Sequence, residues 1–531
     1  MDRNSTKWPI QPMAFFPAFI CMVVFISVGI LNTDALGSFL NGALDVLSAK
    51  FGWLYMLVAL ACVVFSLYFS FSKFGDIRIG GQDAKPDLTM WQWFSICLCS
   101  GIGTGILFWG MGEPMFFYAE PSQASGLVPF SHQAGVNAIS QAAFHWTIMQ
   151  YSMYTMGALG AALVAYGKAS NFSVSASLSG LLGEKAAGTV GHIINGICLF
   201  ALCGAVSCSM GAALLQIGSG LNNLFGVSEG KLLWLVIAIV ITATYTFSSI
   251  TGMKKGLSFL SSLNTKIFLG LALVMLLLGP TNFIADIGVA ALGDMFSTFF
   301  DKATVTNALT TDQWAKNWTV QYWASMIVVA PLIGLFYARL AKGRTVRQFI
   351  AMTIFGPSAF CFIWISIFGG TAIYLQSSGS FDMWASIQAN GMQNTVFAIF
   401  NQYPLAKVFI AVFLFAIFAS LVTYADPMTS VLATLSCKSL HIDQEPPRTL
   451  KLLWGGTIGT IAYLIIATGG IDGIRGMFTL IGFPLMFLLI GICVSAVISA
   501  ARYFEKGAAM DSVVTPVEGS CTRGRLGSSA E

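Results

Sequence analysis

The sequence predicts an all-α membrane protein with twelve transmembrane helices. Of its 531 residues, 56% are hydrophobic and only 9% are charged, and the mean hydropathy is +0.76. Soluble domains carry about 25% charged residues, so this composition excludes an ordinary soluble fold. Crossing a bilayer takes roughly 20 apolar residues. Segments of that kind lie at 14–32, 53–72, 91–118, 137–166, 190–221, 232–251, 258–280, 318–341, 349–375, 405–434, 450–469 and 476–503.

The basic residues predict how these helices are oriented. Most of the 27 Lys and Arg residues fall in loops on one side when the N-terminus is placed in the cytoplasm, as the positive-inside rule requires. The first segment has no small-residue cleavage site after it, so it is expected to be a membrane helix rather than a signal peptide. We therefore expect a multi-pass protein of the cell inner (plasma) membrane with both termini cytoplasmic.

A glycine-rich run interrupts the third apolar segment. Residues 101–114 read GIGTGILFWGMGEP, and each glycine costs about 1 kcal/mol of helix stability relative to alanine. In lipid, opened backbone persists only beside protein or a water-filled cavity, and transporters build binding sites at such interrupted helices. Close packing between helices through small residues is the alternative interpretation. The residues alone leave both open.

The next apolar segment carries aromatic residues at helical spacing. Trp146, Gln150 and Tyr154 are four residues apart, and Tyr151 lies three before Tyr154, so they share one face. Aromatic faces can bind a quaternary ammonium group through the ring quadrupole, although ordinary helix packing gives the same pattern. His145 is expected to be a hydrogen-bonded structural residue rather than a proton relay.

Two acidic residues lie within apolar segments. Glu113 closes the glycine run, and Asp426 stands in the tenth segment. An intramembrane carboxylate is a candidate functional group. The alternatives are an interfacial acid for Glu113 and a structural ion pair or helix cap for Asp426. Lys266, in the seventh segment, is expected to reach the cytoplasmic interface.

Enzyme signatures are missing from the sequence. It contains no HExxH and no phosphate loop, and the glycine run follows no strand, as a dinucleotide loop would. The eleven cysteines include no CxxC pair, so packed thiols are expected rather than disulfides or a metal site. We expect neither enzymatic activity nor a cofactor.

Five stretches resemble the betaine/carnitine/choline transporter family. They are the glycine run, the FHWT sequence at 144–147, the GPT sequence at 279–281, residues 322–347 and the FGGTA sequence at 368–372. The most specific is 322–347, which begins YWA and ends FYARLAKGRTVR. The resemblance extends over nearly the whole chain in order.

The resemblance implies a five-plus-five inverted-repeat core, as in sodium-coupled amino-acid transporters, with two extra N-terminal helices. The implied units are a cytoplasmic lead at 1–13, two peripheral helices and a cytoplasmic loop at 14–90, the first repeat at 91–282, an external amphipathic helix and loop at 283–317, the second repeat at 318–503 and a short cytoplasmic tail at 504–531. It also implies a homotrimer, joined in part by the external helix, and alternating access about a central site.

The resemblance also implies a substrate site built from glycines and aromatic residues. The positions are Gly101, Gly103, Gly105, Trp146, Tyr151, Tyr154 and Trp323. Where the family carries further tryptophans, this chain has Ser325, Met326 and Val329. A serine hydroxyl and a polarizable thioether replace ring faces there, so a primary-amine, sulfonium or sulfonate zwitterion becomes an alternative to a trimethylammonium substrate.

Na⁺ is the candidate coupling ion by the same resemblance. The family's sodium site corresponds here to the backbone of Cys99 and Ile102 and to Thr423 and Tyr424, the last usually a serine. Sodium-independent exchangers have an arginine where this chain has Asn264. Sodium symport is therefore expected, and exchange of substrate for its product is the alternative.

The sequence thus predicts a secondary active transporter that imports a small zwitterionic or cationic amine, with a small-molecule substrate and membrane lipid as partners and no nucleic acid. A ligand-gated channel or receptor is the alternative from another functional class. Saturable uptake would distinguish a carrier from either.

Overall fold

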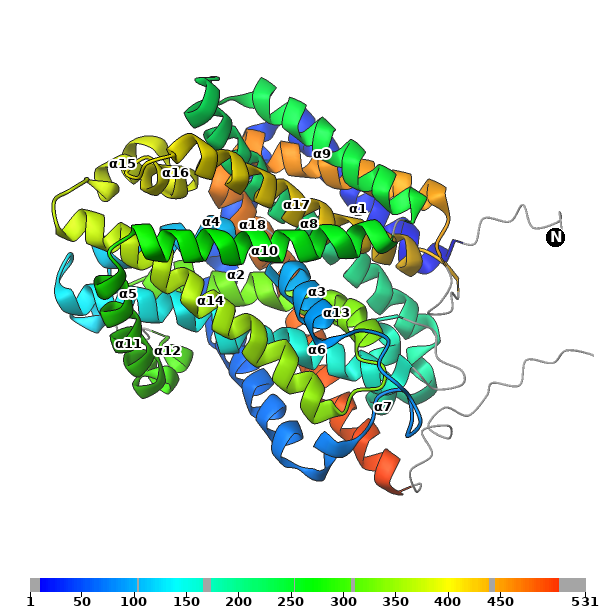
Figure 1. Ribbon diagram of the computed structural model, residues 1–531. Coiled ribbons are helices and arrows are strands. Elements are labelled where there is room, and N and C mark those ends of the chain that lie inside the picture. Colours follow the sequence, from blue (N-terminus) through cyan, green and yellow to red (C-terminus); the bar gives the residue numbers. More distant parts are fainter. Residues whose placement is uncertain are drawn as a thin grey trace, which may run out of the picture.

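The computed structural model describes residues 10–102, 105–165, 173–252, 254–306, 311–438 and 445–505. Across these residues the secondary structure is helical, with two isolated β-bridges and no strand. Long helices run side by side in a bundle, with α11, α12, α15 and α16 at one end and α7 at the other (Figure 1). The predicted all-α class is confirmed.

Nine of the described helices are long and apolar enough to cross a membrane. They are contained in α1 (Pro12–Leu31), α2 (Thr33–Phe71), α8 (Thr189–Phe225), α9 (Lys231–Thr251), α10 (Lys254–Leu278), α13 (Gln321–Leu340) with the π-helical turn before it (Lys316–Val320), α14 (Val346–Ser377), α17 (Ala406–Leu435) and α18 (Arg448–Glu505). The third and fourth predicted segments are helical too, but each is described in more than one piece. The last two predicted segments both lie in α18.

The third predicted segment is described in two parts, α3 (Met90–Ile102) and α4 (Gly105–Ala119), and residues 103–104 lie outside the described residues. The fourth consists of α5 (His132–Phe144), a π-helical turn and α6 (Gln150–Ala165). The last two both lie in α18, which is kinked at Gly470, where φ is +54° and ψ is −133°. The nine long helices of the described residues therefore account for ten of the twelve predicted segments, because α18 holds two of them.

Shorter helices cap the two ends of the bundle. They are α7 (Ser179–Leu182), α11 (Thr281–Ser297), α12 (Phe299–Thr304), α15 (Met383–Asn390) and α16 (Thr395–Phe400). The helix α11 falls where the external amphipathic helix is expected. It buries Ile287 and Ala291 on one side but exposes Val289 and Phe296 on the other, so its outer face is apolar as well.

The family-like sequence after α13 anchors the loop that precedes α3. The Arg347 guanidinium donates to Asp76 at 2.6 Å, and Arg344 donates to the carbonyl of Leu88 at 2.8 Å. Gly343, directly before Arg344, has φ +75°, and a Cβ there would lie 2.3 Å from the carbonyl carbon of Lys85. Both the turn and this close approach require glycine.

We expect Gly343→Ala to lower thermal stability far more than Gly379→Ala. Both glycines have positive φ, but no atom lies within 4 Å of a Cβ at Gly379. The control therefore carries only the backbone strain, about 1 kcal/mol, whereas Gly343→Ala adds a backbone clash of roughly 1–3 kcal/mol. Thermal unfolding of the purified proteins in detergent measures the difference. Equal losses of Tm would show that the contact with Lys85 contributes nothing.

Candidate substrate cavity

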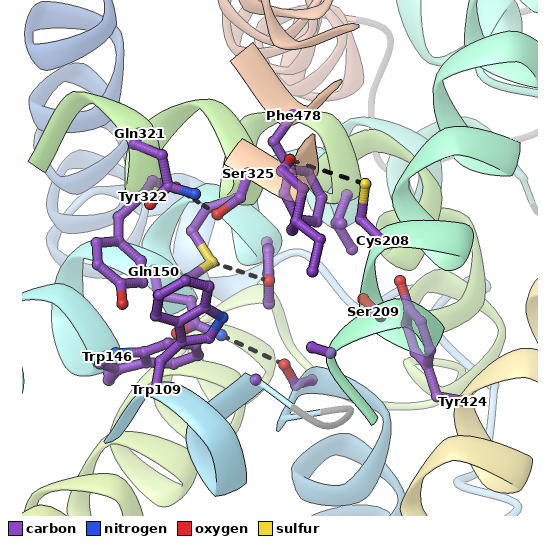
Figure 2. Close-up of a pocket in the computed structure, with 17 residues that line it drawn as sticks. Trp109, Trp146, Gln150, Cys208, Ser209, Gln321, Tyr322, Ser325, Tyr424 and Phe478 are labelled. Carbon is purple, nitrogen blue, oxygen red and sulfur yellow. Dashed lines mark hydrogen bonds between the residues drawn. The ribbon is translucent and has the colours of Figure 1, made fainter. Parts of the chain in front are cut away.

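A cavity lies where α3 and α4, on either side of residues 103–104, meet five other segments of the chain. Its walls come from α3 and α4, from the π-helical turn with α6, and from α8, α13, α17 and α18. Figure 2 shows its lining: Gly101, Gly105, Trp109, Trp146, Gln150, Tyr154, Cys208, Ser209, Ala212, Gln321, Tyr322, Ser325, Met326, Val329, Tyr424, Ile474 and Phe478. Two glycines of the glycine-rich run, Gly101 and Gly105, thus border a hollow.

The π-helical turn presents Trp146 to this cavity. It runs from His145 to Met149, and its residue Thr147 has the non-helical angles φ −118° and ψ −118°. The Thr147 hydroxyl donates to the carbonyl of Ala143 at 2.6 Å, which satisfies a backbone acceptor inside the turn. Single π-helical turns within α-helices occur frequently at functional sites.

Two glycines allow the aromatic rings to approach the backbone. A Cβ at Gly105 would lie 2.7 Å from Cη2 of Trp146, and one at Gly101 would lie 2.5 Å from the hydroxyl oxygen of Tyr337. The Gly101 carbonyl also accepts a hydrogen bond from Gln150 Nε2 at 3.3 Å. The glycine run therefore permits close packing, which was one of the two interpretations offered by the sequence, and it borders the cavity.

The lining combines ring faces with polar groups. The Tyr322 ring lies edge-on to Trp109 and Trp146, at centroid distances of 5.9 and 5.5 Å. The Tyr154 hydroxyl donates to the Met326 sulfur at 3.2 Å. The Oε1 atom of Gln150 is buried without a hydrogen-bond partner in the described part of the chain. Such a lining suits a small ligand that has both a cationic and a polar end.

A buried carboxyl group lies directly behind this wall. Nδ1 of His145 lies 2.7 Å from Oε1 of Glu113, and the indole nitrogen of Trp146 donates to Oε2 of Glu113 at 2.5 Å. His145 Nε2 lies 3.1 Å from both the Thr319 hydroxyl and Nε2 of Gln141. Glu113 and His145 are fully buried and paired with each other. His145 is hydrogen-bonded, as expected.

The structure divides the predicted substrate-binding residues into two groups. Those that line the cavity are Gly101, Gly105, Trp146, Tyr154, Ser325 and Met326. Among the described residues, the lining includes neither Tyr151, whose hydroxyl lies 3.4 Å from the sulfur of Cys361, nor Trp323. The Trp323 ring instead packs edge-on against Phe144 and His145. Gly103 lies outside the described residues.

Several lining residues were not selected from the sequence. Trp109 lies inside the glycine run, so its neighbours could have indicated it. Cys208 and Ser209 belong to a stretch of small residues in α8 that suggested only helix packing. Phe478 is one apolar residue among many in α18, and nothing in the sequence distinguishes it.

The predicted ion-binding residues also separate. Tyr424 lines the cavity, whereas Cys99 of α3 contacts α10, with its sulfur 3.3 Å from the Thr265 hydroxyl. In α17, the Thr423 hydroxyl donates to the carbonyl of Ser420 at 3.1 Å. The backbone of Ile102 ends α3, and its side chain is outside the described set. The helices α3, α10 and α17 thus meet around these residues.

Asn264 supplies a polar group at this meeting point. Its Nδ2 donates to the Ser420 hydroxyl at 2.8 Å, and its Oδ1 is buried with no hydrogen-bond partner among the described residues. Lys266, two positions later, is exposed on another face of α10. The region therefore contains a buried amide oxygen without a partner in the described structure. It lies at the position where the resemblance implies an arginine in sodium-independent exchangers.

Asp426 takes part in a separate polar junction between α9 and α17. Its carboxylate accepts a hydrogen bond from Ser248 at 2.5 Å. Nearby, Lys451 donates to the carbonyl of Ser249 at 2.8 Å and to Glu445 at 2.9 Å. This arrangement agrees with the structural alternative for Asp426, because the residue does not line the cavity.

Comparison with known proteins identifies the family. The family model for BCCT, betaine/carnitine/choline family transporter, matches residues 13–504. The chain is 31% identical to a glycine betaine transporter of Bacillus subtilis, over 92% of this chain and 94% of the relative. It is 28% identical to an ectoine/hydroxyectoine transporter of Virgibacillus pantothenticus, over 92% and 96%. It is 26% identical to a high-affinity choline transport protein of Escherichia coli, over 92% and 72%.

These relatives are transporters and not enzymes, and their similarity extends from end to end of the helical bundle described above. The chain is an integral membrane protein that belongs to the betaine/carnitine/choline transporter family.

Proposed function

We propose that this protein is a secondary active transporter that imports a small zwitterionic or cationic amine by alternating access. The observation that carries this proposal is the cavity bordered by α3 and α4, where ring faces and polar groups from several helices converge. The relatives named as betaine, ectoine and choline transporters support the same class of substrate. Rocking of one group of helices about such a site is a common transport mechanism.

The cationic end of the substrate would lie against Trp109, Trp146, Tyr154 and Tyr322. Desolvated cation–π contacts contribute about 2 kcal/mol or more. Ser325, Met326 and Val329, which replace the family's tryptophans, all line the cavity. A substrate without a quaternary ammonium, such as a primary amine or a sulfonate, is therefore the second candidate. The unpaired oxygen of Gln150 could accept a hydrogen bond from a primary amine, whereas a trimethylammonium group has no N–H to donate.

Binding assays with purified protein test the substrate proposal. Betaine, choline, carnitine, ectoine and taurine should be compared by thermal shift and by calorimetry. We expect at least one cationic or zwitterionic amine to raise Tm and to bind saturably, because ligands of the folded state stabilise it. Large ion currents without saturable uptake in proteoliposomes would instead support a channel.

We propose Na⁺ as the coupling ion, held near α3, α10 and α17. Sodium prefers oxygen ligands, as other hard cations do, and the oxygen of Asn264 is buried there without a hydrogen-bond partner in the described structure. The exposed position of Lys266 means that it does not supply the fixed charge that replaces sodium in exchangers. Thr423 and the backbone of Cys99 and Ile102 would complete the site, whereas Tyr424 would face the substrate.

We predict that Asn264→Leu raises the sodium concentration for half-maximal uptake by about tenfold, since it removes one amide oxygen. Uptake into proteoliposomes at graded external Na⁺, with K⁺ as the balancing ion, measures this. Lys266→Leu is the matched control on an exposed face of α10, and its sodium dependence should match the unmodified protein. If uptake requires internal substrate and ignores Na⁺, the protein is an exchanger and the sodium proposal fails.

We also propose the finer architecture that the resemblance implies. The segment that holds α3 and α4 and the segment that holds α13 with its preceding π-helical turn would occupy matching positions in the inverted repeats. The exposed apolar residues Val289, Leu292 and Phe296 of α11 would face other protomers of a trimer. Light scattering of the purified protein, corrected for bound detergent, tests the oligomeric state.

The plasma-membrane location with cytoplasmic termini is proposed from the basic loops.

A further inference from the structure

The Glu113 carboxyl group is placed to act on the substrate through another side chain. It is fully buried in α4 and does not itself line the cavity in the described structure. It reaches the cavity wall through the hydrogen bond from the indole nitrogen of Trp146, whose ring lines the cavity, and it also interacts with the hydroxyl of Tyr322, another lining residue. A charge on Glu113 would therefore be felt by a ligand through the Trp146 ring.

The hydrogen bonds around Glu113 suit the ionised form of its carboxyl group, whose charge burial disfavours. His145 Nε2 faces two groups that can donate, the Thr319 hydroxyl and the Gln141 amide nitrogen. When Nε2 accepts, Nδ1 carries the proton and donates to Glu113. Glu113 then accepts from both His145 and Trp146, which is the arrangement of a carboxylate rather than of an acid.

One cation acts on Glu113 from outside the cavity. Burial disfavours a charge on Glu113, and the Trp146 and Tyr322 side chains and the positive charge of Arg475 oppose that cost. The Arg475 guanidinium lies 5.5 Å from the ring centroid of Trp109 and 4.8 Å from that of Trp318.

An indole that donates its N–H to a carboxylate has a more negative ring face, because the anion polarises the ring toward the side away from the bond. Its attraction for a cation increases accordingly. We propose that the Glu113 carboxylate, acting through Trp146, sets the affinity of the cavity for a positively charged nitrogen. Glu113 is thus a specificity-determining positioning residue, and it compensates for the ring faces missing at Ser325, Met326 and Val329. The inference rests on the proposed function.

The substitution Glu113→Gln tests this because it removes the charge and keeps an oxygen that can accept from Trp146. Binding of choline is compared with binding of 3,3-dimethylbutan-1-ol, which has the same shape with an uncharged carbon in place of nitrogen. We expect Glu113→Gln to weaken choline binding by about tenfold, from the loss of one buried charge, and to change binding of the neutral compound by less than about threefold.

Two further variants keep the result interpretable. Glu120→Gln removes the same charge at the exposed outer end of the same apolar segment and should leave choline affinity within about twofold, since surface charge is screened. Trp146→Phe keeps a ring and removes the N–H, so Glu113→Gln should have little further effect when it is added to Trp146→Phe. If Glu113→Gln folds poorly, the single variant Trp146→Phe decides. It removes the N–H through which Glu113 polarises the ring, so it should weaken binding of choline more than binding of the neutral compound.

An equal loss of both ligands would overturn the inference and assign Glu113 a purely structural role. Unchanged choline affinity in Glu113→Gln would overturn it as well. If the unmodified protein binds neither choline nor any other cationic amine, the proposed function itself fails. The two failures are therefore distinguished by the unmodified protein.

Discussion

Replacing Trp146 with alanine will abolish measurable substrate binding while leaving most of the protein folded. The ring forms part of the cavity wall, packs against Gly105 and is oriented by Glu113. Its removal deletes a desolvated ring face worth about 2 kcal/mol or more and leaves the buried carboxylate with one donor fewer, a further 1–3 kcal/mol or so. We expect the dissociation constant of the best ligand to rise by at least about 30-fold in calorimetry or in a radioligand assay.

Two other tryptophans provide the comparison. Trp91 is exposed at the start of α3, so Trp91→Ala should bind normally. Trp323 is buried against Phe144 and His145 outside the lining, so Trp323→Ala should lower the stability by about 3–5 kcal/mol and leave the affinity of the folded fraction within about threefold. A loss of affinity in Trp323→Ala without a loss of stability would instead return Trp323 to the substrate site.

Replacing Gly334 with alanine will prevent the protein from folding into a monodisperse particle. At this position α13 crosses α6 with backbone against backbone, and a Cβ on Gly334 would lie 2.5 Å from the carbonyl carbon of Gly157. Neither backbone can move without separating the two helices, so the cost exceeds the usual 1–3 kcal/mol or so of overpacking. Size-exclusion chromatography of a fluorescent fusion should show aggregated protein.

The control for Gly334→Ala is Gly270→Ala in α10. Its Cβ would meet no atom within 4 Å, and alanine favours a helix by about 1 kcal/mol relative to glycine. This variant should elute normally and unfold at the same or a higher temperature. A normal elution profile for Gly334→Ala would contradict the close crossing of α6 and α13.

The carboxylates illustrate what sequence reasoning could not decide. Glu113 and Asp426 both precede a proline inside an apolar segment, and the same general rule made each a functional candidate. Only the structure places Glu113 behind a cavity wall and Asp426 in a junction with Ser248. Whether a carboxylate is buried depends on which helices surround it, and the local sequence does not contain that information.

The aromatic residues show the same limit. Helical spacing correctly placed Trp146, Gln150 and Tyr154 on one face, and all three line the cavity. The spacing also placed Tyr151 on that face, and the resemblance added Trp323, but neither lines the cavity in the described structure, and neither method selected Trp109. Spacing identifies residues on one side of a helix, but which of them reach a cavity depends on the neighbouring helices.

The sequence by itself determined the class of protein, the number of apolar segments and the family resemblance. These depend on local hydropathy and on short motifs, and each helix satisfies its own backbone hydrogen bonds in lipid regardless of its neighbours. Only the tertiary structure decided which rings share a cavity, which carboxylate lies behind it and which helices cross at glycine. Those features arise where helices distant in the chain meet, because contact geometry there depends on kinks, π-helical turns and crossing points that no single segment specifies.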